Sequence, residues 1–243
     1  MIIARQVLFV EGILEMLCRL NVPLKRPEDI IPHLAKRDAH WKNQHSAKEL
    51  VLAWVNAKND FPPSVKRLLR NCPAFEDAEL IDGCFEREVD LGTAGRNSQT
   101  DLMVIVGLGK KLGIIAVEGK VEEPFGELVS EWNDHSDGKL TRLNALCSTL
   151  GLGPSGVSHL RYQLLHRTAS AIFEAKRYRS DHALMLVHTF SPTNRWYSDF
   201  VTFADALGVS VGSIGTVSSS KICEGVNLRL AWVKDEFAAE VSK

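Results

Sequence analysis

Two carboxylates and one ammonium group stand at the ends of a largely apolar stretch, residues 100–120. Asp101 begins the stretch, and Glu118 and Lys120 end it. Carboxylate oxygens are the ligands that Mg²⁺ and Mn²⁺ prefer, and an ammonium group beside them can stabilise negative charge that develops during a reaction. These residue types therefore suit metal-assisted hydrolysis, provided that the chain brings them together.

The residues between these groups predict a β-hairpin that does bring them together. Residues 108–111 can close a tight turn with Gly109 at the first central position, where a type II′ turn requires a positive φ. Facing partners then have residue numbers that sum to 219, so Asp101 faces Glu118. Directly opposed side chains have Cβ atoms about 4.5–5.5 Å apart. Lys120 lies two residues beyond Glu118 and points to the same face.

Such a pairing of like charges needs a physical explanation, because the strands around it are apolar. Continuous apolar runs are typical of central strands that are covered on both faces. Two opposed carboxylates at the rim of such a sheet destabilise each other, and burial raises the pKa of at least one of them. Lys120 offsets part of the repulsion, and a divalent cation would offset more. We therefore expect Asp101 and Glu118 to be ligands of Mg²⁺ or Mn²⁺.

Asp101 followed by Glu118-Gly119-Lys120 resembles the D…(D/E)-x-K signature of the PD-(D/E)XK nuclease superfamily. The wider sequence is similar to a mainly bacterial family of nuclease-like proteins in the stretches SAKEL at 46–50, EGKVEEPFG at 118–126 and RYQLLHRTASA at 161–171. The resemblance covers most of the chain after about residue 40. One departure is Thr100, which stands where the signature has its proline.

The resemblance implies a fold and an activity. The fold is a restriction-endonuclease-like core with the element order α-β-β-β-α-β, and the activity is hydrolysis of phosphodiester bonds in nucleic acid, with DNA as the first candidate. Asp101 and Glu118 would hold Mg²⁺ or Mn²⁺. Lys120 would position the attacking water or stabilise the transition state.

The helix after the third strand carries two candidates for supporting the site. Related nucleases place a polar residue from this helix beside the carboxylates, and Gln163 and Arg167 could do so here. His166 lies on the same face, together with Ser170 and Glu174. The alternative is that this polar face is simply solvated.

Two glutamates are further supporting candidates. Glu49, on the helix before the sheet, could reach the metal, but a capping box with Ser46 as the N-cap is the interpretation that we favour. Glu88 could be a third acid near the end of the first strand. Alternation along that strand predicts that Glu86 and Glu88 share a face and are exposed to solvent.

The hydrophobic pattern predicts an α/β fold with a mixed central sheet flanked by helices. Strands are expected at 78–91, on both sides of the 108–111 turn, at 182–190 and at 226–234, and helices near 28–37, 46–57, 65–70, 138–150, 158–179 and 196–207. A weaker helical pattern covers residues 1–20. We expect residues 1–60 to form an N-terminal helical region that packs on a core domain of residues 61–243.

Composition sets limits on partners and location. The 243 residues carry a formal net charge of −1, so no overall basic field favours nucleic acid, although a local groove remains open. The five cysteines are scattered and lack a C-x-x-C pair, which indicates neither a disulfide framework nor a zinc site. We expect a cytoplasmic protein without a signal peptide or membrane span.

Two alternatives to a nuclease stay open from the sequence. One is a catalytically inactive binding or structural module that keeps the nuclease fold, which the near-neutral charge suits. The other is a metal-binding hydrolase that acts on a substrate other than nucleic acid.

Overall fold

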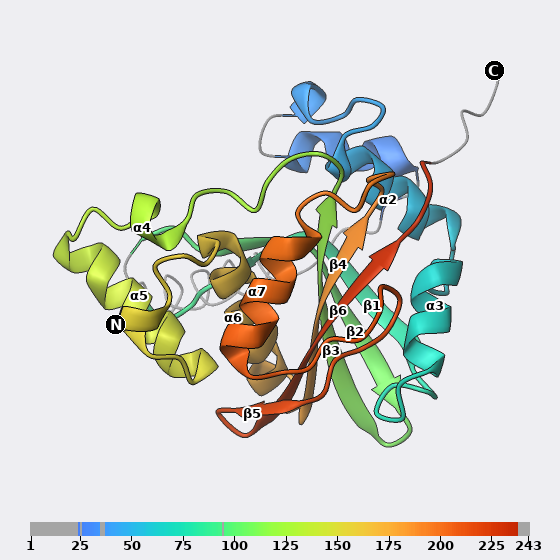
Figure 1. Ribbon diagram of the computed structural model, residues 1–243. Helices are drawn as coiled ribbons and strands as arrows, with labels where there is room; N and C mark the ends of the chain where they lie inside the picture. Colours follow the sequence, from blue (N-terminus) through green and yellow to red (C-terminus); the bar gives the residue numbers. More distant parts are fainter. Residues whose placement is uncertain (1–23, 25, 35–36, 94, 238–243) are drawn as a thin grey trace, which may run out of the picture.

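A six-stranded mixed sheet forms the centre of the molecule (Figure 1). The computed structural model describes residue 24 and residues 26–34, 37–93 and 95–237, so the helix predicted within residues 1–20 lies outside the described residues. The strands are β1 (Glu79–Val89), β2 (Ser98–Leu108), β3 (Lys111–Lys120), β4 (His182–Thr189), β5 (Lys221–Cys223) and β6 (Val226–Lys234). Their order in the sheet is β1-β2-β3-β4-β6-β5.

The sheet combines an antiparallel half with a parallel centre. β1, β2 and β3 form an antiparallel meander, whereas β4 runs parallel to both β3 and β6, and β5 pairs antiparallel with β6. The parallel step from β3 to β4 needs a long crossover, which contains the helix α6 (Tyr162–Arg177). The predicted α/β fold with a mixed sheet flanked by helices is therefore confirmed.

Helices cover both faces of the sheet, which explains why the central strands are continuously apolar. The helices are α2 (Ser46–Asn56), α3 (Pro63–Arg70), α4 (Val129–Trp132), α5 (Asp137–Leu150), α6 and α7 (Tyr197–Leu207), with short 3₁₀ turns at Pro27–His33, Arg37–Ala39 and Pro154–Gly156. Buried residues of α5, α6 and α7 form one hydrophobic cluster with the sheet, and those of α2 and α3 form another on its opposite face. Figure 1 shows α3 on one side of the sheet and α5 to α7 on the other.

The predicted hairpin register is correct. Leu102 faces Val117, and Leu108 faces Lys111, as a sum of 219 requires. Gly109 has a φ of 63°, a conformation that glycine adopts without a steric penalty. A one-residue slip would have moved Asp101 and Glu118 to different faces of the sheet, so this register decides whether the site can exist.

Most predicted elements are present, and the differences have local causes. The helix expected from residue 158 begins at Tyr162, because Leu128 and Arg161 form a β-bridge and Tyr162 donates its backbone N–H to Glu127 O. The N-cap of α2 is His45 rather than Ser46, so the predicted cap is wrong by one residue. The short edge strand β5 was not among the predicted strands.

The segment between residue 40 and the first strand packs directly on the sheet. Leu50 and Trp54 of α2 share a hydrophobic cluster with Val104 of β2 and Leu186 of β4. The division of the chain at residue 60 stays a prediction, although α2 and the sheet bury apolar surface together. None of the described helices is long and apolar enough to cross a lipid bilayer.

Candidate functional site

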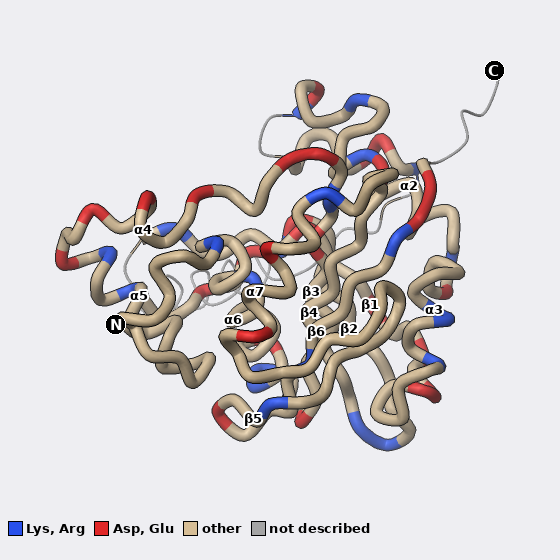
Figure 2. The backbone as a smooth tube through the Cα atoms, in the orientation of Figure 1, with Lys and Arg blue, Asp and Glu red and all other residues tan. Residues whose placement is uncertain are grey.

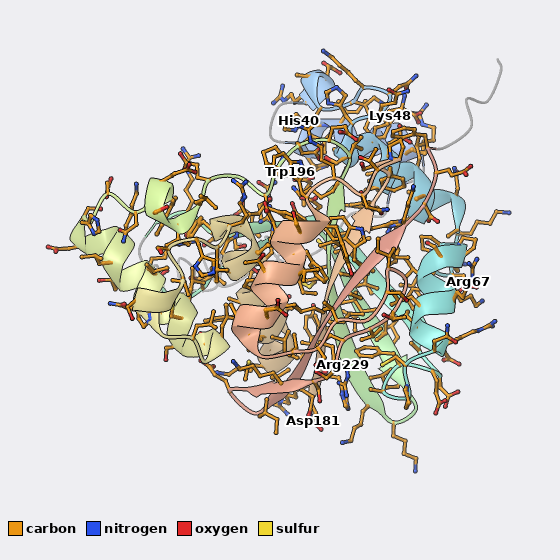
Figure 3. All side chains as sticks on the ribbon, in the orientation of Figure 1. His40, Lys48, Arg67, Asp181, Trp196 and Arg229 are labelled. Atoms are coloured by element: carbon orange, nitrogen blue, oxygen red, sulfur yellow. The ribbon has the colours of Figure 1, made fainter. Side chains whose placement is uncertain are left out.

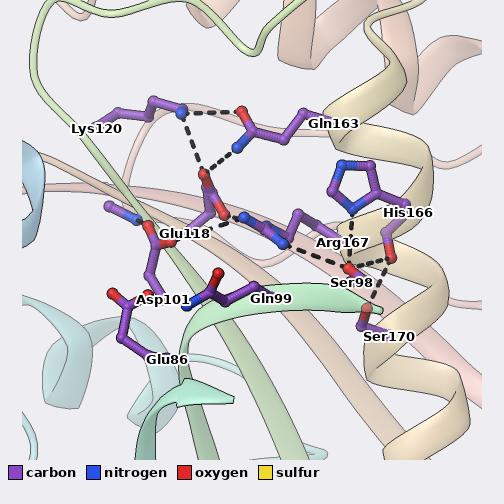
Figure 4. Close-up of polar contacts among 11 residues, drawn as sticks. Glu86, Ser98, Gln99, Asp101, Glu118, Lys120, Gln163, His166, Arg167 and Ser170 are labelled. Atoms are coloured by element: carbon purple, nitrogen blue, oxygen red, sulfur yellow. Dashed lines mark hydrogen bonds and ion pairs between the residues drawn. The ribbon is translucent and has the colours of Figure 1, made fainter. Parts of the chain in front are cut away.

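Asp101, Glu118 and Lys120 line one cavity of about 1000 Å³ at the edge where β2 begins and β3 ends. Gln163 and Arg167 reach the same cavity from α6, and the first turn of α2 forms another part of its wall. Figure 4 shows these side chains pointing toward one another from the strands and from α6. The structure therefore brings together the three residues of the sequence motif and two of the four supporting candidates.

Glu118 is the centre of the polar network. Its Oε1 accepts hydrogen bonds from Lys120 Nζ over 3.1 Å and from Gln163 Nε2 over 2.7 Å. Its Oε2 accepts one from Arg167 Nε over 2.6 Å. The carboxylate is buried, which alone would raise its pKa, but the charges of Arg167 and Lys120 outweigh burial and hold the pKa below its ordinary value. Glu118 is therefore a buried anion stabilised by two cations.

Asp101 lies beside Glu118 but is less well compensated. Its Oδ2 accepts a hydrogen bond from the backbone N–H of Gly119 over 2.9 Å, and its Oδ1 lies 3.8 Å from Arg167 Nη2. Burial, together with the neighbouring charge of Glu118, raises the pKa of Asp101 to about 7. Of the two opposed carboxylates, Asp101 is thus the one whose pKa is raised, whereas Glu118 stays ionised.

Glu86 of β1 is a third carboxylate of this site, and the expectation that it is solvated was wrong. The register of β1 and β2 pairs Phe85 with Leu102 and Arg87 with Thr100, which places Glu86 beside Asp101. Its backbone has a φ of 53°, which is uncommon for a residue with a side chain and breaks the simple alternation of faces. The side chain lines the cavity, and Figure 4 shows it beside Asp101.

The environment of Glu86 resists ionisation. Burial is the main cause, and the charge of Asp101 adds to it, so that the pKa of Glu86 rises to about 8. Gln99, two residues before Asp101 on β2, donates a hydrogen bond from Nε2 to Glu86 Oε2 over 2.6 Å. Glu86, Asp101 and Glu118 therefore form a row across three neighbouring strands.

The polar face of α6 is packed against the sheet rather than solvated. Gln163 Oε1 accepts a hydrogen bond from Lys120 Nζ over 3.0 Å, while its Nε2 bonds Glu118. Arg167 is 9% exposed and also donates from Nη1 to Ser98 Oγ over 3.4 Å. Gln163 and Arg167 thus hold the carboxylate of Glu118 from the helix side.

His166 extends this network away from the carboxylates. Its Nδ1 lies 2.8 Å from Ser98 Oγ, and Ser170 donates its hydroxyl to His166 O. Burial, followed by the charges of Arg167 and Arg142, lowers the pKa of His166 well below its ordinary value. His166 is therefore a neutral ring at neutral pH.

Two of the four supporting candidates lie outside the cavity wall. Glu49 is buried, and its Oε1 accepts the backbone N–H of Gln44 over 2.9 Å, so it fastens the segment before α2. Glu88 is exposed and accepts a hydrogen bond from Asn97 Nδ2 over 3.4 Å. Neither residue lines the cavity.

Gly119 allows α2 to approach the middle of the motif. A Cβ at this position would lie 3.3 Å from two side-chain atoms of Leu50 and 3.4 Å from Ser46 O. Such distances are shorter than ordinary carbon contacts of about 3.5–4.0 Å. The glycine between Glu118 and Lys120 therefore lets α2 pack close to β3 without displacing Leu50.

A family model described as a domain of unknown function, DUF6946, matches residues 23–237, which include every residue of the site. The chain belongs to this family. No curated protein and no solved structure matches the DUF6946 chain.

The donor chemistry of this DUF6946 site fits a hard divalent cation. Glu86, Asp101 and Glu118 offer only oxygen donors, although Glu86, with a pKa of about 8, keeps its proton at neutral pH. Within the described residues, however, no group of three or more His, Cys, Asp or Glu side chains is already arranged to hold a metal ion. Both oxygens of Glu118 accept bonds from cations, so a metal would have to compete with Arg167 for this carboxylate.

Proposed function

We propose that this protein is a metal-dependent nuclease that hydrolyses phosphodiester bonds, with Asp101, Glu118 and Lys120 as its central residues. The observation that carries the proposal is their convergence in one cavity of about 1000 Å³. The antiparallel β1-β2-β3 meander, the α6 crossover and the parallel strand β4 agree with the core that the resemblance to PD-(D/E)XK nucleases implies.

Asp101 and Glu118 would hold Mg²⁺ or Mn²⁺ through their carboxylate oxygens. When bound, such an ion supplies Lewis acidity and lowers the pKa of a coordinated water. The raised pKa of Asp101 is consistent with this role, because it reflects negative charge that the protein leaves only partly compensated. A divalent cation would favour the ionised form of Asp101 and remove that cost.

Lys120 would act on the substrate side of the carboxylates. Two of its three N–H groups are used by Glu118 Oε1 and Gln163 Oε1. The third can donate to an oxygen of the scissile phosphate or to the attacking water. Because the side chain is buried and held at two points, its charge would be fixed before the reaction begins, which favours electrostatic stabilisation of the transition state.

A catalytically inactive binding module is the second candidate, and the position of Arg167 favours it. Arg167 contacts both Glu118 and Asp101, as a bridging cation would. With Lys120 also bonded to Glu118, the network is largely neutralised by the protein's own side chains. On this account the motif residues would hold β2, β3 and α6 together without catalysis.

An assay of phosphodiester cleavage with Mg²⁺ or Mn²⁺ separates the two candidates. The nuclease account predicts cleavage by the wild type that is lost in Lys120→Met, which keeps most of the buried volume and removes the charge. Absence of cleavage by the wild type on single-stranded and duplex DNA and on RNA would favour the binding module.

A further inference from the structure

A second cavity, of about 490 Å³, adjoins the carboxylate cavity and has the opposite charge. We call it the cationic pocket; its wall includes Arg96, Ser98, Trp132, Lys139, Arg142, Tyr162 and His166. The two cavities share Tyr162 and His166. Among the residues that the structure describes, no aspartate or glutamate lines the cationic pocket, whereas six line the carboxylate cavity.

Stacked rings form one wall of the cationic pocket. The rings of Trp132 and Tyr162 have centroids 3.7 Å apart and an interplanar angle of 9°. The ring of His166 follows at 5.0 Å from that of Tyr162. These residues come from α4 and α6, so a segment before α5 and the crossover helix build the wall together.

Three cations accompany this aromatic wall. Arg142 of α5 donates from Nε to Tyr162 Oη over 2.7 Å and from Nη1 to Thr93 Oγ1 over 3.3 Å, which leaves several guanidinium N–H groups for a ligand. Arg96 is exposed in the loop before β2. Lys139 Nζ lies 5.5 Å from the centroid of the Trp132 ring and is paired with Asp134. Figure 2 shows basic positions along the first half of α5.

This combination matches the chemistry of one nucleotide. A nucleotide offers a flat ring that packs against aromatic side chains and a phosphate that binds arginine. A volume of about 490 Å³ lies within the ordinary range of small-ligand sites, about 300–1000 Å³. The acidic cavity alone would repel a phosphate backbone, so a cationic neighbour is needed to hold a nucleic acid there.

We propose that the cationic pocket binds an unpaired nucleotide of a single-stranded nucleic acid, with its base on the outer face of the stacked Trp132–Tyr162 pair and its phosphate on Arg96 and Arg142. A base within a duplex has both faces covered by its neighbours, so only an unpaired base can meet this wall. The role that we give to this pocket rests on the proposed nuclease function, because a nucleotide bound there would place the next part of the strand at the carboxylates. Binding itself needs neither metal nor catalysis.

The test is fluorescence anisotropy with labelled 12-nucleotide strands of DNA or RNA and a 12-base-pair duplex, at low salt and without divalent ions. We expect at least one single strand to bind about tenfold more tightly than the duplex. Arg96→Ala removes an exposed cation of the pocket and should weaken binding about tenfold. Arg67→Ala is the matched control, because Arg67 is exposed on α3, across the sheet (Figure 3), and should change binding less than about twofold.

A second variant tests the aromatic wall. Trp132→Leu should weaken single-strand binding by about tenfold or more, whereas Trp132→Phe should keep most of it, because stacking of one base is worth about 1–3 kcal/mol. Equal binding of duplex and single strands, equal effects of Arg96→Ala and Arg67→Ala, or no binding at all would overturn the inference. If the wild type binds single strands but cleaves nothing, the nuclease proposal is contradicted and the binding proposal stands. If the wild type cleaves and both Arg96→Ala and Trp132→Leu cleave equally well, nucleotide binding in the cationic pocket is contradicted and the nuclease proposal stands.

Discussion

Arg167 donates a hydrogen bond from Nε to Glu118 Oε2 over 2.6 Å, and both side chains are buried. The guanidinium also lies near Asp101, with Nη2 3.8 Å from Oδ1. Arg167 is thus the protein's own cation between the two carboxylates that would bind a metal. Since opposite charges at such distances attract by several kcal/mol in a partly buried site, Arg167 and a divalent ion must compete for Glu118.

Arg167→Met should therefore increase the affinity for Mn²⁺ by about tenfold or more, whereas Asp101→Asn should decrease it. Isothermal titration calorimetry measures both changes. Arg87→Met is the matched control, because Arg87 forms a similarly buried ion pair with Glu174, with 3.1 Å between Nη2 and Oε2. Both arginine variants should lose stability, on the order of 3–5 kcal/mol. An unchanged Mn²⁺ affinity in Arg167→Met would show that Arg167 does not occupy the metal's place.

The raised pKa of Glu86, about 8, predicts how stability changes with pH. The unfolded chain releases the proton of Glu86 near pH 4.5, whereas the folded protein keeps it until about pH 8. The folded state thus binds more protons than the unfolded state between these values, so the contribution of Glu86 to the free energy of unfolding should fall as pH rises from about 4.5 to 8. Each unit of difference between the folded and unfolded pKa of Glu86 changes the free energy of unfolding by about 1.4 kcal/mol.

Glu86→Gln should make this fall in stability shallower, because glutamine cannot release a proton. Denaturant unfolding at several pH values measures it, and Asp134→Asn, at an exposed carboxylate, serves as the control. His166, whose pKa is lowered in the folded protein, contributes equally to the wild type and to Glu86→Gln, so its effect cancels in the comparison. The same slope in the wild type and in Glu86→Gln would contradict a protonated Glu86.

Gly119→Ala should destabilise the protein by about 1–3 kcal/mol, because the added methyl group would press on Leu50 and Ser46 O of α2. Thermal unfolding measures the loss. Gly153→Ala is a suitable control, since a Cβ there would meet nothing within 4 Å and the φ of Gly153 is −83°. If Gly119→Ala and Gly153→Ala are equally stable, α2 does not pack against the motif as described.

The sequence was sufficient for the hairpin and the motif, because both depend on local rules. A glycine at the turn and the two-residue period of a strand place Asp101 near Glu118 without any knowledge of the rest of the fold. The same reasoning failed at Glu86. A positive φ at this residue interrupts the alternation on which the prediction of solvent exposure depended.

Other parts of the site depend on packing between distant segments. Gln163 and Arg167 lie on a polar helical face. A face that supports a site and a face that is solvated have the same periodicity, so only the packing of α6 on the sheet distinguishes them. The stacking of Trp132 on Tyr162 joins residues 30 positions apart through the bridge between Leu128 and Arg161. No local pattern in the sequence predicts such a contact.

Cleavage of phosphodiester bonds is the activity that we propose for the cavity around Asp101, Glu118 and Lys120. The most direct measurement is the cleavage rate of end-labelled single-stranded DNA and RNA, and of duplex DNA, with Mg²⁺ or Mn²⁺ at low salt. Wild-type protein should cleave at least one of these substrates, and Lys120→Met, confirmed as folded by circular dichroism, should cleave it at least about a hundredfold more slowly. Equal cleavage by Lys120→Met, or no cleavage of any substrate by the wild type, would contradict the claim.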